Sequence, residues 1–185
     1  MSLFEFVTVM VSMILALCLG HVLRSTSLLA KTEKSVAPYL PYTIWTVVLL
    51  LSVINHWWSL WDLRDIEWTY ASFLYILMAP ILISFAAGFL MPEDTDAKVI
   101  SLKSHYLRVR RLFFATMTGY GIFMLFDGPL LSGQSLSSGV SIFSLILLMD
   151  TVIPMFTPNQ RINAACGALS IALVVSVMVT RYLAA

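Results

Sequence analysis

Residues 68–91 read WTYASFLYILMAPILISFAAGFLM, a run without a single charged side chain. The hydrocarbon core of a bilayer is about 30 Å thick, and roughly 20 helical residues cross it. A run of this length and composition therefore predicts a helix that spans a membrane. The rest of the chain agrees, because 59% of its 185 residues are hydrophobic and only 11% are charged. A soluble domain of this size could not bury so much apolar surface.

Five further apolar runs lie on either side of this one. The sequence therefore predicts an all-α, polytopic membrane bundle with six transmembrane helices in a single domain, residues 1–185. The predicted helices cover residues 3–23, 38–61, 68–91, 112–131, 138–156 and 162–183. Strands are not expected, because membrane-barrel strands are about ten residues long with alternating polarity. The runs in this chain are longer and continuous.

Residues 98–111, just before the fourth predicted helix, combine an apolar face with several basic side chains. This pattern predicts a short amphipathic helix on the cytoplasmic interface, or an extension of the fourth helix. The arginines of this segment are expected to contact anionic lipid headgroups. They are Arg108, Arg110 and Arg111.

Basic residues are divided unevenly between the two sets of connections that six crossings create. Only Arg64 and Arg181 fall in one set, and the other nine lysines and arginines fall in the other. Because basic residues accumulate in cytoplasmic loops, the larger set is expected in the cytoplasm and both termini outside. The first charged residue of the chain is Glu5 and no basic residue precedes the first apolar run, so no cleaved signal peptide is expected. The expected location is the bacterial inner (plasma) membrane, as a multi-pass protein.

Four tryptophans crowd the predicted outer end of the second and third helices. They are Trp57, Trp58, Trp61 and Trp68. Indole rings gather at the membrane–water boundary, so these residues indicate an interfacial aromatic belt. An aromatic cage around a cation or a sugar is the alternative interpretation.

The first predicted helix has a small or polar residue at every fourth position: Thr8, Ser12, Ala16 and Gly20. Glu5 lies one turn earlier on nearly the same face. Positions four residues apart share one side of a helix. The stripe either packs closely within the bundle or between subunits, or it lines a narrow polar path with Glu5 at its mouth.

Polar residues also interrupt the other apolar runs. The second predicted helix has Ser52, Asn55, His56 and Ser59 on one side near its outer end. An ionised carboxylate inside a bilayer is costly unless it is paired or hydrated, so Asp127 and Asp150 are functional candidates. The predicted pathway residues are Glu5, Thr8, Ser12, His56, Asp127 and Asp150.

The last predicted helix carries a second row of small residues at intervals of four. The row is Ala164, Ala168, Ala172 and Ser176. Small residues let helix backbones approach closely in lipid, so this row is predicted to pack against another helix or another chain. The expected partners are membrane lipids and either further copies of this chain or another membrane protein.

Other kinds of chemistry are not indicated. A net charge of +1 gives no electrostatic case for binding nucleic acid. The histidines His21, His56 and His105 do not form a metal or haem ligand set. No hydrolase, phosphate-binding or dinucleotide-binding motif is found. No enzyme activity, cofactor or metal is therefore expected.

Three features of residues 3–90 resemble the six-helix potassium channels of endolysosomes and bacteria. Phe4-Glu5-Phe6 opens the first helix, residues 54–58 (INHWW) close the second, and the third is apolar with the central Pro80. The family begins its first helix with Phe-Ser-Asp, which is absent here, and the second histidine of its Asn-His-His segment is Trp57. Those channels also keep both termini in the cytoplasm, whereas the charge distribution here places them outside.

The resemblance implies a channel whose pore is lined by the first helix, at Thr8, Ser12 and Ala16. From all these features we expect a small oligomeric channel or transporter for an ion or a small solute. The alternative is a non-catalytic structural or accessory subunit that binds lipid or another membrane protein.

Overall fold

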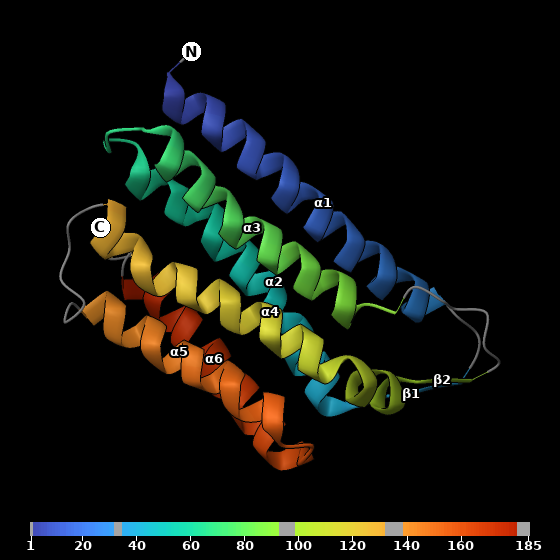
Figure 1. Cartoon of the computed structure of the whole chain (residues 1–185). Coiled ribbons are helices and arrows are strands. Elements are labelled where there is room, and N and C mark those ends of the chain that lie inside the picture. The colour runs from blue at the N-terminus through green and yellow to red at the C-terminus, as the bar shows by residue number, and fades with distance from the viewer. Residues whose placement is uncertain (1, 32–34, 93–98, 132–138, 181–185) are drawn as a thin grey trace.

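The computed structural model describes residues 2–31, 35–92, 99–131 and 139–180. These residues form six α-helices, one short 3₁₀ helix and two short strands. Their bounds are α1 (Leu3–Lys31), β1 (Ser35–Ala37), α2 (Leu40–Ser59), η1 (Leu60–Leu63), α3 (Tyr70–Leu90), β2 (Val99–Ser101), α4 (Leu102–Leu131), α5 (Gly139–Phe156) and α6 (Gln160–Met178). The helices lie side by side and run alternately up and down in one elongated bundle (Figure 1).

Four helical segments are long and apolar enough to cross a membrane. They are α1, α2 continued by η1 (Leu40–Leu63), α3 and α6. The apolar part of α5, Ser144–Phe156, is shorter, and the first ten residues of α4 include one lysine and three arginines. The predicted all-α class is thus confirmed, and four segments of the described chain are long and apolar enough to cross a membrane.

The segment predicted as an amphipathic helix is the beginning of α4. This helix starts at Leu102 and continues without a break to Leu131. The extension of the fourth helix is therefore the correct alternative. The predicted helix boundaries also move at α1, which runs to Lys31 instead of residue 23, because the polar residues 24–27 (RSTS) end the apolar run but remain helical. Residues 181–183 of the last predicted helix lie outside the described residues.

The expectation of no strands is wrong in one place. β1 and β2 form a two-stranded parallel sheet in the register Ser35↔Val99, Val36↔Ile100 and Ala37↔Ser101. The two strands belong to the connections that follow α1 and α3, at one end of the bundle (Figure 1). Arguments from long apolar runs concern only membrane strands and cannot detect three-residue strands in such connections.

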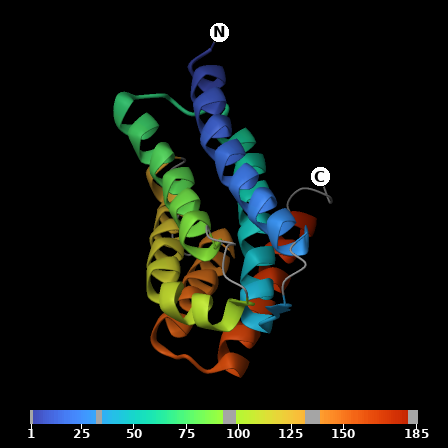
Figure 2. The ribbon, with the colours of Figure 1, turned by 90° about the vertical axis from the view of Figure 1, so that its right-hand side faces the viewer.

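The helices contact one another in a defined order. α3 packs against α4 and α1, α4 packs against α5, and α2 packs against α6 (Figure 2). Trp45 links α2 to α4. Its ring lies edge-on to those of Phe113 and Phe114, with ring centroids 5.9 and 4.7 Å apart. Such edge-to-face contacts add to the packing of a buried aromatic core. The core fixes α2, α4 and α6 around a space that they partly enclose.

Candidate functional site

A cavity of about 200 Å³ lies among α2, α3, α4, α5 and α6. It extends from η1 toward the middle of the bundle. Its polar lining residues are Ser52, Asn55, His56, Ser59, Asp62, Tyr120, Asp127, Ser144, Thr151 and Ser170. Apolar side chains, among them Ile76, Met117 and Val174, fill the remaining wall. The cavity is large enough for about six water molecules, because one water occupies about 30 Å³ in the liquid.

The polar side of α2 supplies four of these residues. Counted from Ser52, the other three lie three, four and seven positions later: Asn55, His56 and Ser59. This spacing puts all four on one face of the helix. All four line the cavity. The side of α2 that the sequence marked as polar is thus the side that faces the interior space.

His56 is a deeply buried, ionisable group of this lining. Its side chain is 3% exposed, and neither ring nitrogen has a hydrogen-bond partner among the described residues. The ring lies edge-on to that of Tyr120, with centroids 5.8 Å apart. The amide oxygen of Asn55 is also buried without a partner there. Buried polar atoms are nearly always hydrogen-bonded, so these atoms require water or a solute in the cavity.

Three carboxylates belong to the cavity or its wall. Asp62 is exposed on η1, at the end of the bundle, and Asp127 is partly buried on α4 beside Tyr75. Asp150 on α5 is 5% exposed, and its Oδ2 lies 3.4 Å from the hydroxyl of Ser170, which lines the cavity. Within the described ranges, neither Asp127 nor Asp150 forms a salt bridge.

The hydroxyls on α5 and α6 continue this polar surface. Thr151 is buried, lies 3.0 Å from the hydroxyl of Thr118 and donates to the carbonyl of Leu148 at 2.8 Å. Ser170 on α6 connects the cavity to Asp150. The cavity wall formed by α5 and α6 therefore carries hydroxyl groups that can accept or donate hydrogen bonds.

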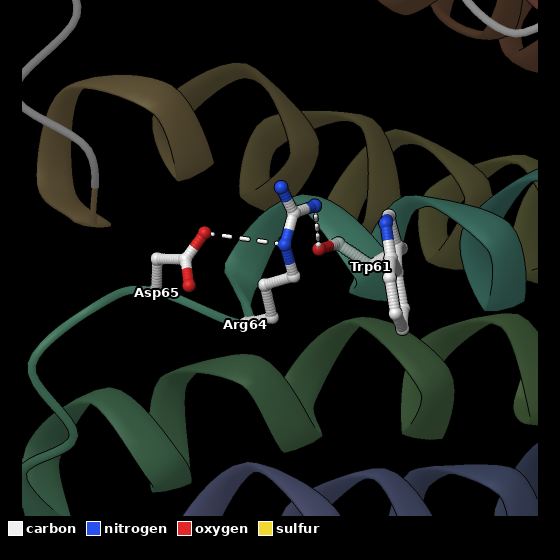
Figure 3. A network of polar contacts seen from close by, with 3 residues as sticks. All are labelled: Trp61, Arg64 and Asp65. Carbon is white, nitrogen blue, oxygen red and sulfur yellow. Dashed lines mark hydrogen bonds and ion pairs between the residues drawn. The ribbon is translucent and has the colours of Figure 1, made fainter.

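The one salt bridge among the described residues lies outside the cavity, just after η1 (Figure 3). Arg64 Nε is 3.2 Å from Asp65 Oδ2, and its Nη1 donates to the carbonyl of Trp61 at 3.1 Å. The guanidinium carbon also lies 5.1 Å from the centre of the Trp61 ring. Arg64 is thus engaged by exposed neighbours. No lysine or arginine is found among the described residues that line the cavity.

The predicted pathway residues of α1 lie elsewhere. Glu5 is exposed and forms reciprocal hydrogen bonds with Ser2, of 2.9 and 3.1 Å, that cap the start of the helix. Ser12 accepts a hydrogen bond of 3.0 Å from Trp57, and neither Thr8 nor Ser12 lines the cavity. Among the described residues, His56 and Asp127 therefore line one cavity, Asp150 contacts it through Ser170, and the other three candidates do not line it.

The row of small residues on α6 faces outward. Ala168 and Ala172 are exposed, whereas Asn163, Gly167, Ser170 and Val174 form the buried face of this helix. Within this chain, the residues of α6 that pack against other helices thus lie one or two positions away from the predicted row of small residues. A contact of Ala164, Ala168, Ala172 and Ser176 with another chain stays a prediction.

The predicted headgroup arginines also differ in position. Arg108 and Arg111 are exposed, while Arg110 is only 8% exposed, near Tyr39 and Tyr106. Headgroup contact stays a prediction for Arg108 and Arg111. Arg110 points into the protein, with Nε and Nη1 lacking a hydrogen-bond partner among the described residues.

Ser170 and Asp62 were missed by the sequence interpretation. A usable signal existed for Ser170, because Asn163, Gly167 and Ser170 recur at helical spacing on the side of α6 away from the alanines. No signal in the sequence links Asp62 to the other polar residues, and only the fold places it in the same cavity lining as Asp127 of α4.

The described residues contain no group of three or more histidine, cysteine or acidic side chains that could hold a metal ion. Comparison with known proteins finds no matching family model, no matching curated protein and no matching solved structure. The chemical character of the cavity is therefore the basis for assigning a function.

Proposed function

We propose that this protein is a small channel or transporter for an ion or a small solute, and that the solute occupies the cavity around His56 and Asp127. The observation that carries the proposal is a polar, partly unsatisfied cavity inside an otherwise apolar helical bundle. Buried ionisable and polar groups at membrane depth are costly, and they are characteristic of ion and solute pathways. A protein that needed only stability would fill this space with apolar side chains.

The proposal includes six membrane crossings. α4 and α5 add two crossings to those of the four apolar segments, because each runs alongside these segments for most of the bundle length (Figure 1). The basic connections then lie in the cytoplasm of a bacterial inner membrane and the tryptophans near η1 lie at the outer interface. Trp57, Trp58 and Trp61 are each at least half exposed, which suits contact with that interface.

The interior cavity suits a pathway better than the face of α1 does. On α1, Ala16 and Gly20 are exposed, and no atom lies within 4 Å of a Cβ added at Gly20. This face of α1 and the outward face of α6 are where further copies of the chain would pack in a homo-oligomer. Close contact of small residues drives such association in lipid.

One specific observation supports the second candidate, an accessory subunit. The exposed small residues of α6, Ala168 and Ala172, would permit close approach of a helix from a different membrane protein. In that case the cavity would hold ordered water and move nothing. A flux measurement on the purified protein separates the two functions.

The first prediction concerns Ser52→Leu, which places a branched apolar side chain in the cavity. We expect solute flux through reconstituted liposomes to fall about tenfold or more, since an apolar obstruction removes both space and hydrogen-bonding partners. Ser27→Leu on the exposed face of α1 is the matched control and should leave flux unchanged. Elution volume and helical content show whether each variant is folded.

Equal flux in Ser52→Leu and the unaltered protein would exclude the cavity as the pathway. Absence of flux in the unaltered protein, for cations, anions and neutral solutes alike, would exclude transport by this chain alone and favour the accessory subunit.

A further inference from the structure

We infer that the cavity selects a small monovalent cation, either a metal ion or a small ammonium compound. This inference rests on the proposed function and adds the charge and size of the solute. Four features of the cavity support it: the charges of its lining residues, the buried polar atoms without a hydrogen-bond partner, the positions of the carboxyl groups and the cavity volume.

Aspartates are present among the described residues that line the cavity, whereas lysine and arginine are not. Asp62 and Asp127 line the cavity, Asp150 joins it through Ser170, and lysine and arginine do not contribute to this lining. The nearest arginine in sequence, Arg64, is held by Asp65 and Trp61 on the exposed surface (Figure 3). A buried carboxylate needs a positive partner, and here the protein supplies none to Asp127 or Asp150 within the described chain. A cation from solution would fill this role.

The unsatisfied atoms are able to coordinate or hydrogen-bond a cation. Asn55 offers a carbonyl oxygen, and one ring nitrogen of a neutral His56 is an acceptor. Ser52, Thr151 and Ser170 add hydroxyl oxygens. Oxygen-rich surroundings with a carboxylate suit alkali metal ions, and the same acceptors suit the N–H groups of an ammonium ion.

The carboxylates follow one another along the bundle. Asp62 lies beyond the end of α2, Asp127 lies four residues before the end of α4, and Asp150 lies eleven residues after the start of α5. At 1.5 Å per helical residue, Asp127 lies about 6 Å before the end of α4 and Asp150 lies about 16 Å into α5. The carboxyl groups thus belong to three different elements around the cavity, where they would attract a positive charge.

The volume limits the size of this cation. A cavity of about 200 Å³ accepts a partly hydrated metal ion or an ammonium compound of a few heavy atoms. The apolar wall at Ile76, Met117 and Val174 would accommodate the methyl groups of such an amine. The experiment below therefore includes both kinds of cation.

The test uses the purified full-length protein in liposomes of neutral lipid. Uptake of potassium, methylammonium, chloride and glycerol is measured for the unaltered protein and for Asp127→Asn, Asp150→Asn and Asp127→Glu. Asp65→Asn is the matched control, because this acid is exposed and lies outside the cavity. A potassium gradient also gives the reversal potential of the unaltered protein, which needs no variant to fold.

We expect uptake of at least one cation to exceed that of chloride and glycerol about tenfold or more, with a reversal potential set by the cation gradient. Asp127→Asn and Asp150→Asn should lower this uptake about tenfold, Asp127→Glu should restore much of it, and Asp65→Asn should have no effect. The relative uptake of potassium and methylammonium identifies the kind of cation.

Chloride or glycerol uptake equal to that of the cations would overturn the cation inference and leave transport itself intact. The same holds if both folded asparagine variants keep full cation uptake. If none of the four probes crosses, the proposed function fails together with the inference.

Discussion

Replacing Asn163 with alanine is expected to lower the free energy of unfolding by about 3 kcal/mol. The side chain is completely buried and links three segments. Its Oδ1 accepts a hydrogen bond of 2.6 Å from the hydroxyl of Tyr106, and its Nδ2 donates to the carbonyls of Thr157 and Asn159, both at 2.8 Å. Alanine would leave the buried hydroxyl of Tyr106 and two carbonyls with lost partners, which is the costly kind of change.

Equilibrium unfolding of the purified protein in mixed detergent micelles measures this effect. Asn159→Ala is the matched control, since the exposed side chain of Asn159 caps α6 by accepting one hydrogen bond from the amide of Arg161, and the carbonyl that Asn163 contacts is retained. Loss of such a cap costs about 1 kcal/mol. If the two variants were equally stable, the network around Asn163 would not hold α4 to the start of α6.

The second large effect is expected for Gly167→Leu, which should destabilise the protein by about 3 kcal/mol or prevent folding. A Cβ at Gly167 would lie 2.5 Å from Ile44 Cγ2 and 3.3 Å from the indole of Trp45, so α2 and α6 could not approach as they do. The indole also donates to the carbonyl of Asn163 at 3.1 Å, one turn away. Separating the helices would break this bond as well.

Gly88→Leu is the control for helix propensity and added bulk. Gly88 lies on the exposed face of α3, and no atom lies within 4 Å of a Cβ added there. Leucine is a better helix former than glycine, so this variant should be neutral or slightly stabilised, by about 1 kcal/mol at most. Thermal unfolding in detergent compares the midpoint temperatures of Gly167→Leu and Gly88→Leu. Equal midpoints would show that α6 does not contact α2 at Gly167.

Much of the fold was predictable because membrane helices are specified locally. A run such as residues 68–91 must satisfy its backbone hydrogen bonds internally in lipid, and a helix does so without help from other segments. The six helices were therefore recognisable one at a time. β1 and β2 were not, because each strand has three residues and is stabilised only by the other, more than 60 positions away.

The cavity was only partly predictable, for a different physical reason. Hydrophobic residues on a membrane helix face either lipid or other helices, so periodicity does not reveal which side is buried. On α6 the alanines at 168 and 172 seemed suited to packing, yet Asn163 and Gly167 form the buried side. On α2 the structure places His56 and its polar neighbours toward the cavity, because these side chains cannot face lipid without a large cost.

The most direct test of the account measures whether water-soluble reagents reach the cavity. In a variant with Cys18→Ala and Cys166→Ala, one cysteine is introduced at Ser52, in the cavity, or at Val47, on the outward face of the same helix. We expect Ser52→Cys to react with membrane-impermeant thiol reagents, and to react faster with a positively charged reagent than with a negatively charged one. Val47→Cys, 39% exposed in the chain and facing lipid, should stay unmodified. Modification of Val47→Cys with no reaction at Ser52→Cys would contradict the account, because the aqueous path would then lie outside the bundle.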